Sequence, residues 1–130
     1  MAHKVMHDRR YARTDEWLQI DGSYALVGLS DYAQDSLSDI VYVELPSVGD
    51  KFDQGQAFGV VESVKAASDV YAPIAGEVIA ANEELEASPE MLNKDAYGAW
   101  MFKLKPDNAA DLAGLMDATA YAAHVEAEAH

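Results

Sequence analysis

A single lysine stands where a tight turn would ordinarily be expected. The run from Phe58 to Pro73 contains two stretches rich in β-branched and aromatic residues, and these predict the two strands of a hairpin. Between them lie Val64, Lys65 and Ala66, which include none of the Gly, Pro or Asn residues that tight turns favour. An amine at an exposed apex is accessible to a modifying enzyme, so Lys65 is the candidate for covalent chemistry. The ordinary alternative is a solubilising surface charge.

Outside this hairpin, the sequence suggests no catalytic machinery. It has no cysteines, which excludes disulfides, thiolate catalysis and cysteine-ligated metals. No histidine lies between Tyr11 and Pro106, so a Ser-His-Asp arrangement is not available there. His3 and His7 have a spacing that can hold a metal on a helix, but they lack apolar periodicity and a third ligand. We therefore expect neither a metal site nor an enzyme.

The length of the chain fits one domain over residues 1–130, and half of the residues are apolar. No stretch approaches the ~18 apolar residues of a membrane-spanning helix, and residues 1–10 lack the apolar segment of a secretion signal. We expect a cytoplasmic protein with no membrane contact, or a mitochondrial-matrix protein if a transit peptide has been removed. Residues 1–10 are expected to be loosely ordered.

The chain is strongly acidic, with a formal charge of −14 from nine Lys and Arg against 23 Asp and Glu. Nucleic acid is disfavoured as a partner, because phosphate binding depends on clustered basic residues. Partner proteins with basic docking surfaces are favoured, since complementary potentials speed encounter. The alternative is that the acidity serves solubility alone.

The apolar pattern predicts a mainly β (α+β) domain of short strands joined by turns. Strands are expected over residues 17–20, 24–29, 40–45, 57–61 and 99–104. Ser30 predicts the start of a helix over residues 31–37, and Ser88 and Pro89 predict a short helix ending near Asn93. A final helix is expected within residues 107–130, capped by Asp107 or Asn108. Its apolar stripe (Leu112, Leu115, Met116 and Thr119 or Ala123) would pack on the β core.

The hairpin and several separate blocks resemble the lipoyl-attachment region of the glycine cleavage H-protein family. These blocks are residues 62–66 (Glu-Ser-Val-Lys-Ala), Ser68-Asp69, Leu45-Pro46, residues 73–78 and residues 27–34. The similarity runs from about Tyr11 to Pro106. It implies the hybrid between barrel and sandwich that lipoyl and biotinyl domains adopt, with short helices and a C-terminal helix.

The resemblance also implies a function. Lys65 would carry lipoate through an amide bond, attached by a lipoate-attaching enzyme. The carrier, expected to be a monomer, would take an aminomethyl group from the pyridoxal-phosphate glycine decarboxylase. It would deliver that group to the tetrahydrofolate-dependent aminomethyltransferase, and then pass electrons to dihydrolipoamide dehydrogenase, which uses FAD and NAD.

Two alternatives remain at this stage: an H-like relay protein that donates lipoate to other proteins, and an unmodified β-domain that only binds proteins. The flanks favour lipoate over biotin, because biotin carriers place Met on both sides of the lysine, where this chain has Val64 and Ala66. Lipoyl domains of 2-oxoacid dehydrogenases usually carry Asp before the lysine.

Further residues are assigned only through the resemblance. Glu62 and Asp69 match acidic positions that lipoate-attaching enzymes read. Thr14, Glu16 and Asp69 match positions that line the pocket for the loaded arm. Lys65 itself matches the attachment site.

The chain departs from the family pattern around this pocket. Asp15 stands where His is common, and Ser36 stands where some members have a His that contacts the arm. The loop over residues 95–100 is one residue shorter than usual. None of these departures lies at Lys65.

Overall fold

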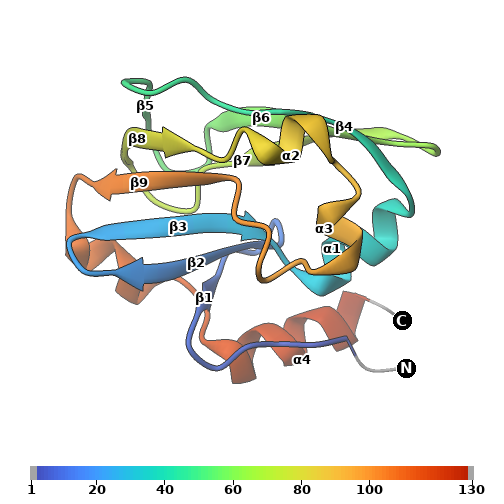
Figure 1. The fold of residues 1–130 in the computed structure, drawn as a ribbon. Coiled ribbons are helices and arrows are strands. Elements are labelled where there is room, and N and C mark those ends of the chain that lie inside the picture. Colours follow the sequence, from blue (N-terminus) through green and yellow to red (C-terminus); the bar gives the residue numbers. More distant parts are fainter. Residues whose placement is uncertain (1–2, 129–130) are drawn as a thin grey trace.

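Two antiparallel β-sheets face each other across one core in this computed structural model, which describes residues 3–128 (Figure 1). The six-stranded sheet has the order β1 (Arg10–Tyr11), β2 (Glu16–Asp21), β3 (Tyr24–Leu29), β9 (Phe102–Pro106), β8 (Gly76–Ala81), β5 (Lys51–Phe52). The three-stranded sheet has the order β4 (Ile40–Glu44), β6 (Ala57–Ser63), β7 (Ala67–Tyr71). This sheet-rich arrangement with short helices confirms the predicted fold class.

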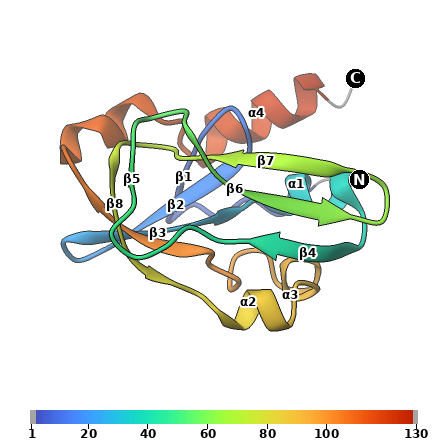
Figure 2. The same cartoon turned by 90° about the horizontal axis from the view of Figure 1, so that it is seen from above.

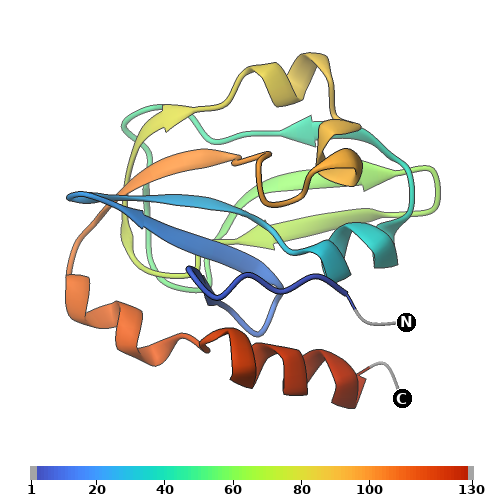
Figure 3. The same ribbon diagram turned by 60° about the horizontal axis from the view of Figure 1, so that its bottom comes forward.

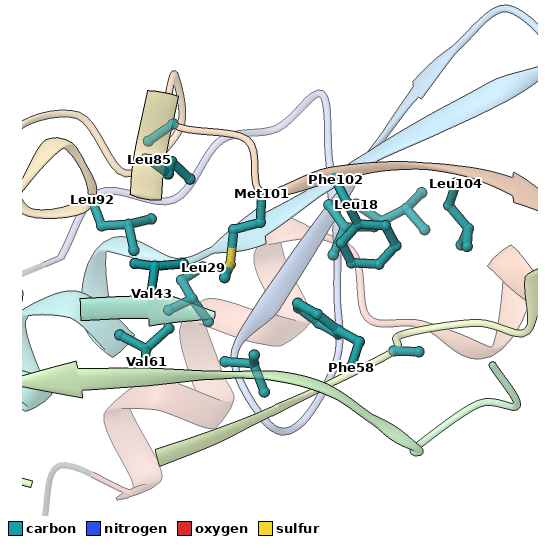
Figure 4. Close-up of a cluster of buried hydrophobic side chains, with 14 of the residues drawn as sticks. Leu18, Leu29, Val43, Phe58, Val61, Leu85, Leu92, Met101, Phe102 and Leu104 are labelled. Atoms are coloured by element: carbon teal, nitrogen blue, oxygen red, sulfur yellow. The ribbon is translucent and has the colours of Figure 1, made fainter. Parts of the chain in front are cut away.

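The core lies where alternate side chains of the two sheets meet, as period-2 strands require. Val27 and Leu104 of the large sheet and Val43 and Val61 of the small sheet are all buried. Phe58 and Phe102 bring their ring centroids within 4.5 Å across the two sheets. Figure 4 shows Phe58 reaching up from the small sheet toward Leu18 and Phe102, and Val61 lying below Val43 and Leu29.

Helix α1 (Asp31–Leu37) confirms the helix predicted over residues 31–37. The Ser30 hydroxyl accepts a hydrogen bond from the Ala33 amide at 3.1 Å, which satisfies one of the free amides of the first turn. The helix ends at Ser38, whose φ of 73° breaks the helical path. The predicted helix near Ser88 differs slightly: two single-turn helices, α2 (Glu84–Ala87) and α3 (Met91–Lys94), flank Ser88 and Pro89.

The C-terminal segment forms two separate elements. The prediction that one helix starts at Asp107 or Asn108 is therefore wrong about where the helix begins. Asn108 caps only the short 3-10 helix η1 (Ala109–Gly114), and α4 (Ala118–Glu128) begins later. Between them the backbones of Tyr11 and Met116 exchange hydrogen bonds of 2.8 and 2.9 Å, which hold the chain extended. The Asp117 carboxylate then accepts from the Ala120 amide at 2.8 Å and starts α4.

Helix α4 packs on a second apolar cluster below the large sheet (Figure 3). Its buried face is Ala118, Tyr121 and Val125, at helical spacing, whereas Thr119 and Ala123 are exposed. The cluster also contains Tyr11, Trp17 and Tyr97. The residues of the predicted apolar stripe therefore do not form one helix face. Leu115 belongs to the main core, and α4 packs through a different set of side chains.

Residues 3–10 make defined contacts, although residues 1–10 were expected to be loosely ordered; residues 1 and 2 lie outside the described chain. Val5 and Met6 pack on the second cluster, and the Tyr97 hydroxyl donates to the Lys4 carbonyl at 2.6 Å. The His3 ring nitrogen lies 2.8 Å from an Asp35 carboxylate oxygen. Over residues 3–128, no helix is long and apolar enough to cross a membrane.

Gly28 supports this packing because it lies directly opposite Trp17 in the β2–β3 ladder. A Cβ at Gly28 would lie 2.5 Å from the Trp17 ring. The ring cannot move easily, since its Nε1 donates to the Ala96 carbonyl at 3.1 Å and the Arg9 guanidinium covers its face at 4.3 Å.

We expect Gly28→Ala to lower the free energy of unfolding by about 2 kcal/mol, the usual cost of overpacking. Gly114→Ala is the matched control, because a Cβ there meets nothing within 4 Å and the backbone φ is not positive. Urea denaturation of the two variants measures the difference. Equal stabilities for the two would contradict the packing argument.

Candidate functional site

The β6–β7 hairpin projects beyond the rest of the small sheet, with Lys65 at its tip (Figure 2). The hairpin tip has no Gly, Pro or Asn, and the side chain of Ser63 stabilises the turn in their place. Its hydroxyl accepts hydrogen bonds from the Lys65 amide at 3.2 Å and the Ala66 amide at 3.1 Å. Its own amide donates to the Ala66 carbonyl at 2.8 Å. A Ser side chain thus closes the turn and leaves the next positions free of turn requirements.

The tip is held against the C-terminal end of α1. The Val64 amide donates to the Asp39 carbonyl at 3.0 Å, and the Lys65 Nζ donates to the Ser36 carbonyl at 2.9 Å. Free carbonyls at a helix C-terminus attract cations, which favours this contact. Lys65 is exposed, so its amine is accessible while its backbone is fixed.

A pocket of about 160 Å³ opens between α1, β7 and the segment before β2. Its lining is apolar in one part and polar in the other. The apolar residues are Leu29, Ala33, Leu37 and Val70, and the polar ones are Thr14, Asp15, Glu16, Ser36, Ser68 and Asp69. Because Ser36 both lines the pocket and accepts from Lys65, the exposed amine lies beside the pocket.

Glu16 is the buried acid of this pocket, with 1% of its surface exposed. One carboxylate oxygen accepts from the Thr14 hydroxyl, and the other accepts from the Tyr71 amide at 3.1 Å. Burial raises the pKa of Glu16 from 4.5 to about 7; the two hydrogen bonds oppose the shift, and the charge of Asp15 adds to it. The carboxyl is therefore poised to change charge near neutral pH.

Asp15 takes an unusual backbone conformation beside Glu16, with φ of 80°. Asp tolerates this region better than most residues. Its Oδ1 accepts from the Tyr121 hydroxyl at 2.9 Å. Burial raises the pKa of Asp15, and the hydrogen bond from Tyr121 opposes that rise.

The structure brings Thr14, Glu16 and Asp69 together around the pocket and places Lys65 beside it. Glu62 is exposed on β6 and does not line the pocket. The roles assigned to these five residues stay predictions. Sequence reasoning missed the apolar part of the lining. The Ser30 cap did predict the helix that carries Ala33 and Leu37. No local signal showed that this helix faces β7 and the segment before β2.

The two departures from the family pattern, Asp15 and Ser36, both line the pocket. The short loop over residues 95–100 does not. It packs instead against the second cluster, where the Ala96 carbonyl accepts from Trp17. The Tyr97 carbonyl accepts from Arg9 at 2.8 Å.

Asp15, His124 and Glu128 form a cluster of side chains of the types that bind metal ions. Their potential ligand atoms lie within 4.8 Å of one another. Each already has a protein partner. The His124 Nε2 lies 3.2 Å from the Arg13 carbonyl and 3.3 Å from Glu128, and Asp15 accepts from Tyr121. These contacts give the cluster a structural role, and we assign it no metal.

The raised pKa of Glu16 predicts a specific pH dependence of stability. Because the folded-state pKa of about 7 lies above the ordinary 4.5, the folded chain binds this proton more tightly than the unfolded chain does. The resulting stabilisation is fully present below pH 4.5 and is lost as the pH rises to about 7. Between these pH values, we expect the free energy of unfolding to fall by on the order of 3 kcal/mol more in the wild type than in Glu16→Gln.

Urea denaturation at several pH values measures this difference. Glu44→Gln is the control, because Glu44 is exposed on β4 and should leave the pH dependence unchanged. Parallel curves for the wild type and Glu16→Gln would contradict the assigned pKa.

Known proteins are similar to this chain in sequence and in fold. Residues 9–128 match the family described as Glycine cleavage H-protein. The chain is 56% identical over 119 residues to the glycine cleavage system H protein of Acidobacterium capsulatum, with 92% of each chain covered. It is 60% identical over 116 residues to glycine cleavage system H protein 2 of Pseudomonas putida, covering 88% of this chain and 91% of that one.

The fold agrees with that result. The crystal structure of a glycine cleavage system H protein from Mycobacterium marinum has a TM-score of 0.84 against this chain at 32% identity. The match covers 92% of this chain and 97% of the other. The chain therefore belongs to the glycine cleavage H-protein family.

Proposed function

We propose that this protein is the lipoyl carrier of a glycine cleavage system, with lipoate attached to Lys65. Membership of the family supports the carrier role and makes the chain a component of a multienzyme system, not an enzyme itself. The observation that supports the attachment site is the position of Lys65. Its amine is exposed at a fixed hairpin tip and lies beside a pocket that is apolar in one part and acidic in the other.

The pocket residues fit a lipoyl arm. A lipoyl group has an apolar hydrocarbon chain, which Leu29, Leu37 and Val70 would cover. Its loaded end would carry an amine, which is cationic near neutral pH and suits the carboxylates of Glu16 and Asp69. When attached, lipoate supplies a disulfide that can accept the aminomethyl group and a dithiol that can be reoxidised.

The chain's own residues then have three tasks. Lys65 provides the tether, which raises the effective concentration of the arm at each partner enzyme. Glu62 and Asp69, exposed on either side of the hairpin, are available to the lipoate-attaching enzyme. Thr14 and Glu16 hold the loaded end within the pocket and away from water.

The proposed partners are glycine decarboxylase, the aminomethyltransferase and dihydrolipoamide dehydrogenase. The acidic surface of the chain favours basic docking faces on each of them. We place the carrier in the cytoplasm, since the relatives it resembles are bacterial proteins. The monomeric state remains a prediction from the resemblance. A relay role, in which lipoate passes from this chain to other proteins, uses the same lysine.

Expression with lipoate should add one lipoyl group, on the peptide that contains Lys65. The modification removes one positive charge, which takes the formal charge from −14 to −15. Intact mass and peptide mass spectrometry measure both changes. Lys65→Arg should stay unmodified, whereas the control Lys51→Arg, at an exposed position on β5, should be modified like the wild type.

An unmodified wild-type chain under these conditions would favour the bare binding module. Modification of Lys65→Arg would show that the attachment site is elsewhere.

Replacement of Glu16 should shorten the lifetime of the loaded arm. A carboxylate keeps the cargo amine protonated, and a protonated amine cannot use its lone pair to expel sulfur. We expect Glu16→Gln to lose the aminomethyl group about tenfold to a hundredfold faster, equivalent to ~1–3 kcal/mol. The difference should be greatest above about pH 7, where Glu16 is ionised, and should shrink as it takes up a proton.

The measurement is formaldehyde release from loaded carriers in the absence of folate. Glu44→Gln again serves as the control for a change of charge outside the pocket. Equal decay of wild type and Glu16→Gln, at equal folding and lipoylation, would remove Glu16 from this role.

A further inference from the structure

The hydroxyl of Tyr121 touches both walls of the pocket, although Tyr121 belongs to the C-terminal helix and does not line the pocket. On one side it donates to the Asp15 carboxylate at 2.9 Å. On the other side it lies 2.6 Å from the Ser30 hydroxyl. Asp15 belongs to the wall that carries Glu16, and Ser30 caps α1, which forms the opposite wall.

The directions of these hydrogen bonds follow from donor counting. A tyrosine hydroxyl has one proton, and an ionised carboxylate can only accept, so Tyr121 donates to Asp15. Ser30 must then donate its proton to the Tyr121 oxygen. The Ser30 oxygen in turn accepts from the Ala33 amide at 3.1 Å. The result is one directed chain of hydrogen bonds from α1 through Tyr121 to Asp15.

Both ends of this chain set the shape of the pocket. Asp15 has a φ of 80°, and its carbonyl accepts from the Ser30 amide at 3.0 Å. The peptide that follows Asp15 leads directly into Glu16. At the other end, Ser30 fixes the first turn of α1, whose Ala33 and Leu37 line the pocket.

Tyr121 is itself rigidly held. Its ring is 1% exposed and stacks on Tyr11 with a centroid distance of 4.2 Å and an interplanar angle of 4°. One turn further along α4, the His124 Nε2 lies 3.2 Å from the Arg13 carbonyl. Helix α4 therefore contacts the segment that contains Arg13 and Asp15 at two points.

We propose that Tyr121 is a positioning residue for the arm pocket, and that its hydroxyl fixes the distance between α1 and the segment that presents Glu16. The proposal rests on the proposed function, because it assigns Tyr121 a role in holding the loaded arm. The groups that face Asp15 are Tyr121, His124 and Glu128 from α4, together with its neighbour Glu16.

Tyr121→Phe tests this with little change in packing, since the ring can still stack on Tyr11. The matched control is Tyr11→Phe. Tyr11 is 0% exposed and belongs to the same cluster, but its hydroxyl bonds the backbone of Met6 and neighbours the Tyr97 hydroxyl, and among the described residues it bonds neither Asp15 nor Ser30. Both variants lose one buried tyrosine hydroxyl. Only Tyr121→Phe loses the side-chain link between Ser30 and Asp15, whose backbones remain hydrogen-bonded.

The first measurement uses the protein without lipoate. NMR titration follows the side-chain carboxyl of Glu16 and the amides of Asp15 and Ala33 across pH 5 to 9. We expect Tyr121→Phe to move the Glu16 titration midpoint and both amide shifts, and Tyr11→Phe to leave them at their wild-type values. Unchanged values in Tyr121→Phe would overturn the proposal, whatever the outcome of lipoylation.

The second measurement uses loaded carriers without folate. Loss of the aminomethyl group should be about fivefold faster in Tyr121→Phe than in Tyr11→Phe, the ratio expected for one hydrogen bond. Equal rates would overturn the positioning role if Glu16→Gln still decays faster than the wild type. If Lys65 takes no lipoate, the proposed function fails, and the titration alone then decides whether Tyr121 sets the geometry of the pocket.

Asp15→Gly provides a second route if Tyr121→Phe does not fold. Gly accepts the positive φ of this position and removes the acceptor for the Tyr121 hydroxyl. If the hydroxyl of Tyr121 links Asp15 to α1, Asp15→Gly should move the amide shift of Ala33 at the other end of the hydrogen-bond chain. An unmoved Ala33 amide in Asp15→Gly would contradict the proposal.

Discussion

The burial of one carboxyl group, that of Glu16, organises the site. A buried carboxylate is costly unless donors reach it, and both of its oxygens have one: the Thr14 hydroxyl and the Tyr71 amide. These donors come from the turn before β2 and from the end of β7. Their hydrogen bonds to Glu16 therefore fix the six-stranded and three-stranded sheets relative to each other at this edge. The pocket is the space that remains when α1 closes over them.

The C-terminal helix contacts the same part of the molecule. Asp15 has a left-handed backbone, and its side chain accepts a hydrogen bond from Tyr121 of α4. The tyrosine is in turn fixed by stacking on Tyr11, whose backbone pairs with Met116 just before the helix. Three segments that are distant in sequence are thereby fixed around one carboxylate.

The sequence was sufficient to predict those elements that depend on residues close together in the chain. The Ser30 cap predicted the start of α1, and the helical spacing of the residues after it predicted its end at Leu37. The lack of Gly, Pro and Asn around Lys65 identified the hairpin tip. The turn at Ser63 and the start of α4 at Asp117 depend on side-chain to backbone bonds that a survey for Gly and Pro overlooks. The link from Tyr121 to Asp15 spans 106 positions and leaves no local trace, so only the folded chain shows it.

A carrier must hold its cargo and also surrender it, which limits how tightly the pocket can bind. A ligand shifts an equilibrium only by its differential affinity for the two states, so a strongly bound arm would rarely be presented to a partner enzyme. A Glu16 pKa of about 7 would suit both demands of the proposed carrier role. The ionised carboxyl would attract a cationic arm end, and proton uptake near neutral pH would weaken that attraction. Since burial is the main cause of the raised pKa, the depth of Glu16 beneath α1 and β7 would set the balance between holding and release in that role.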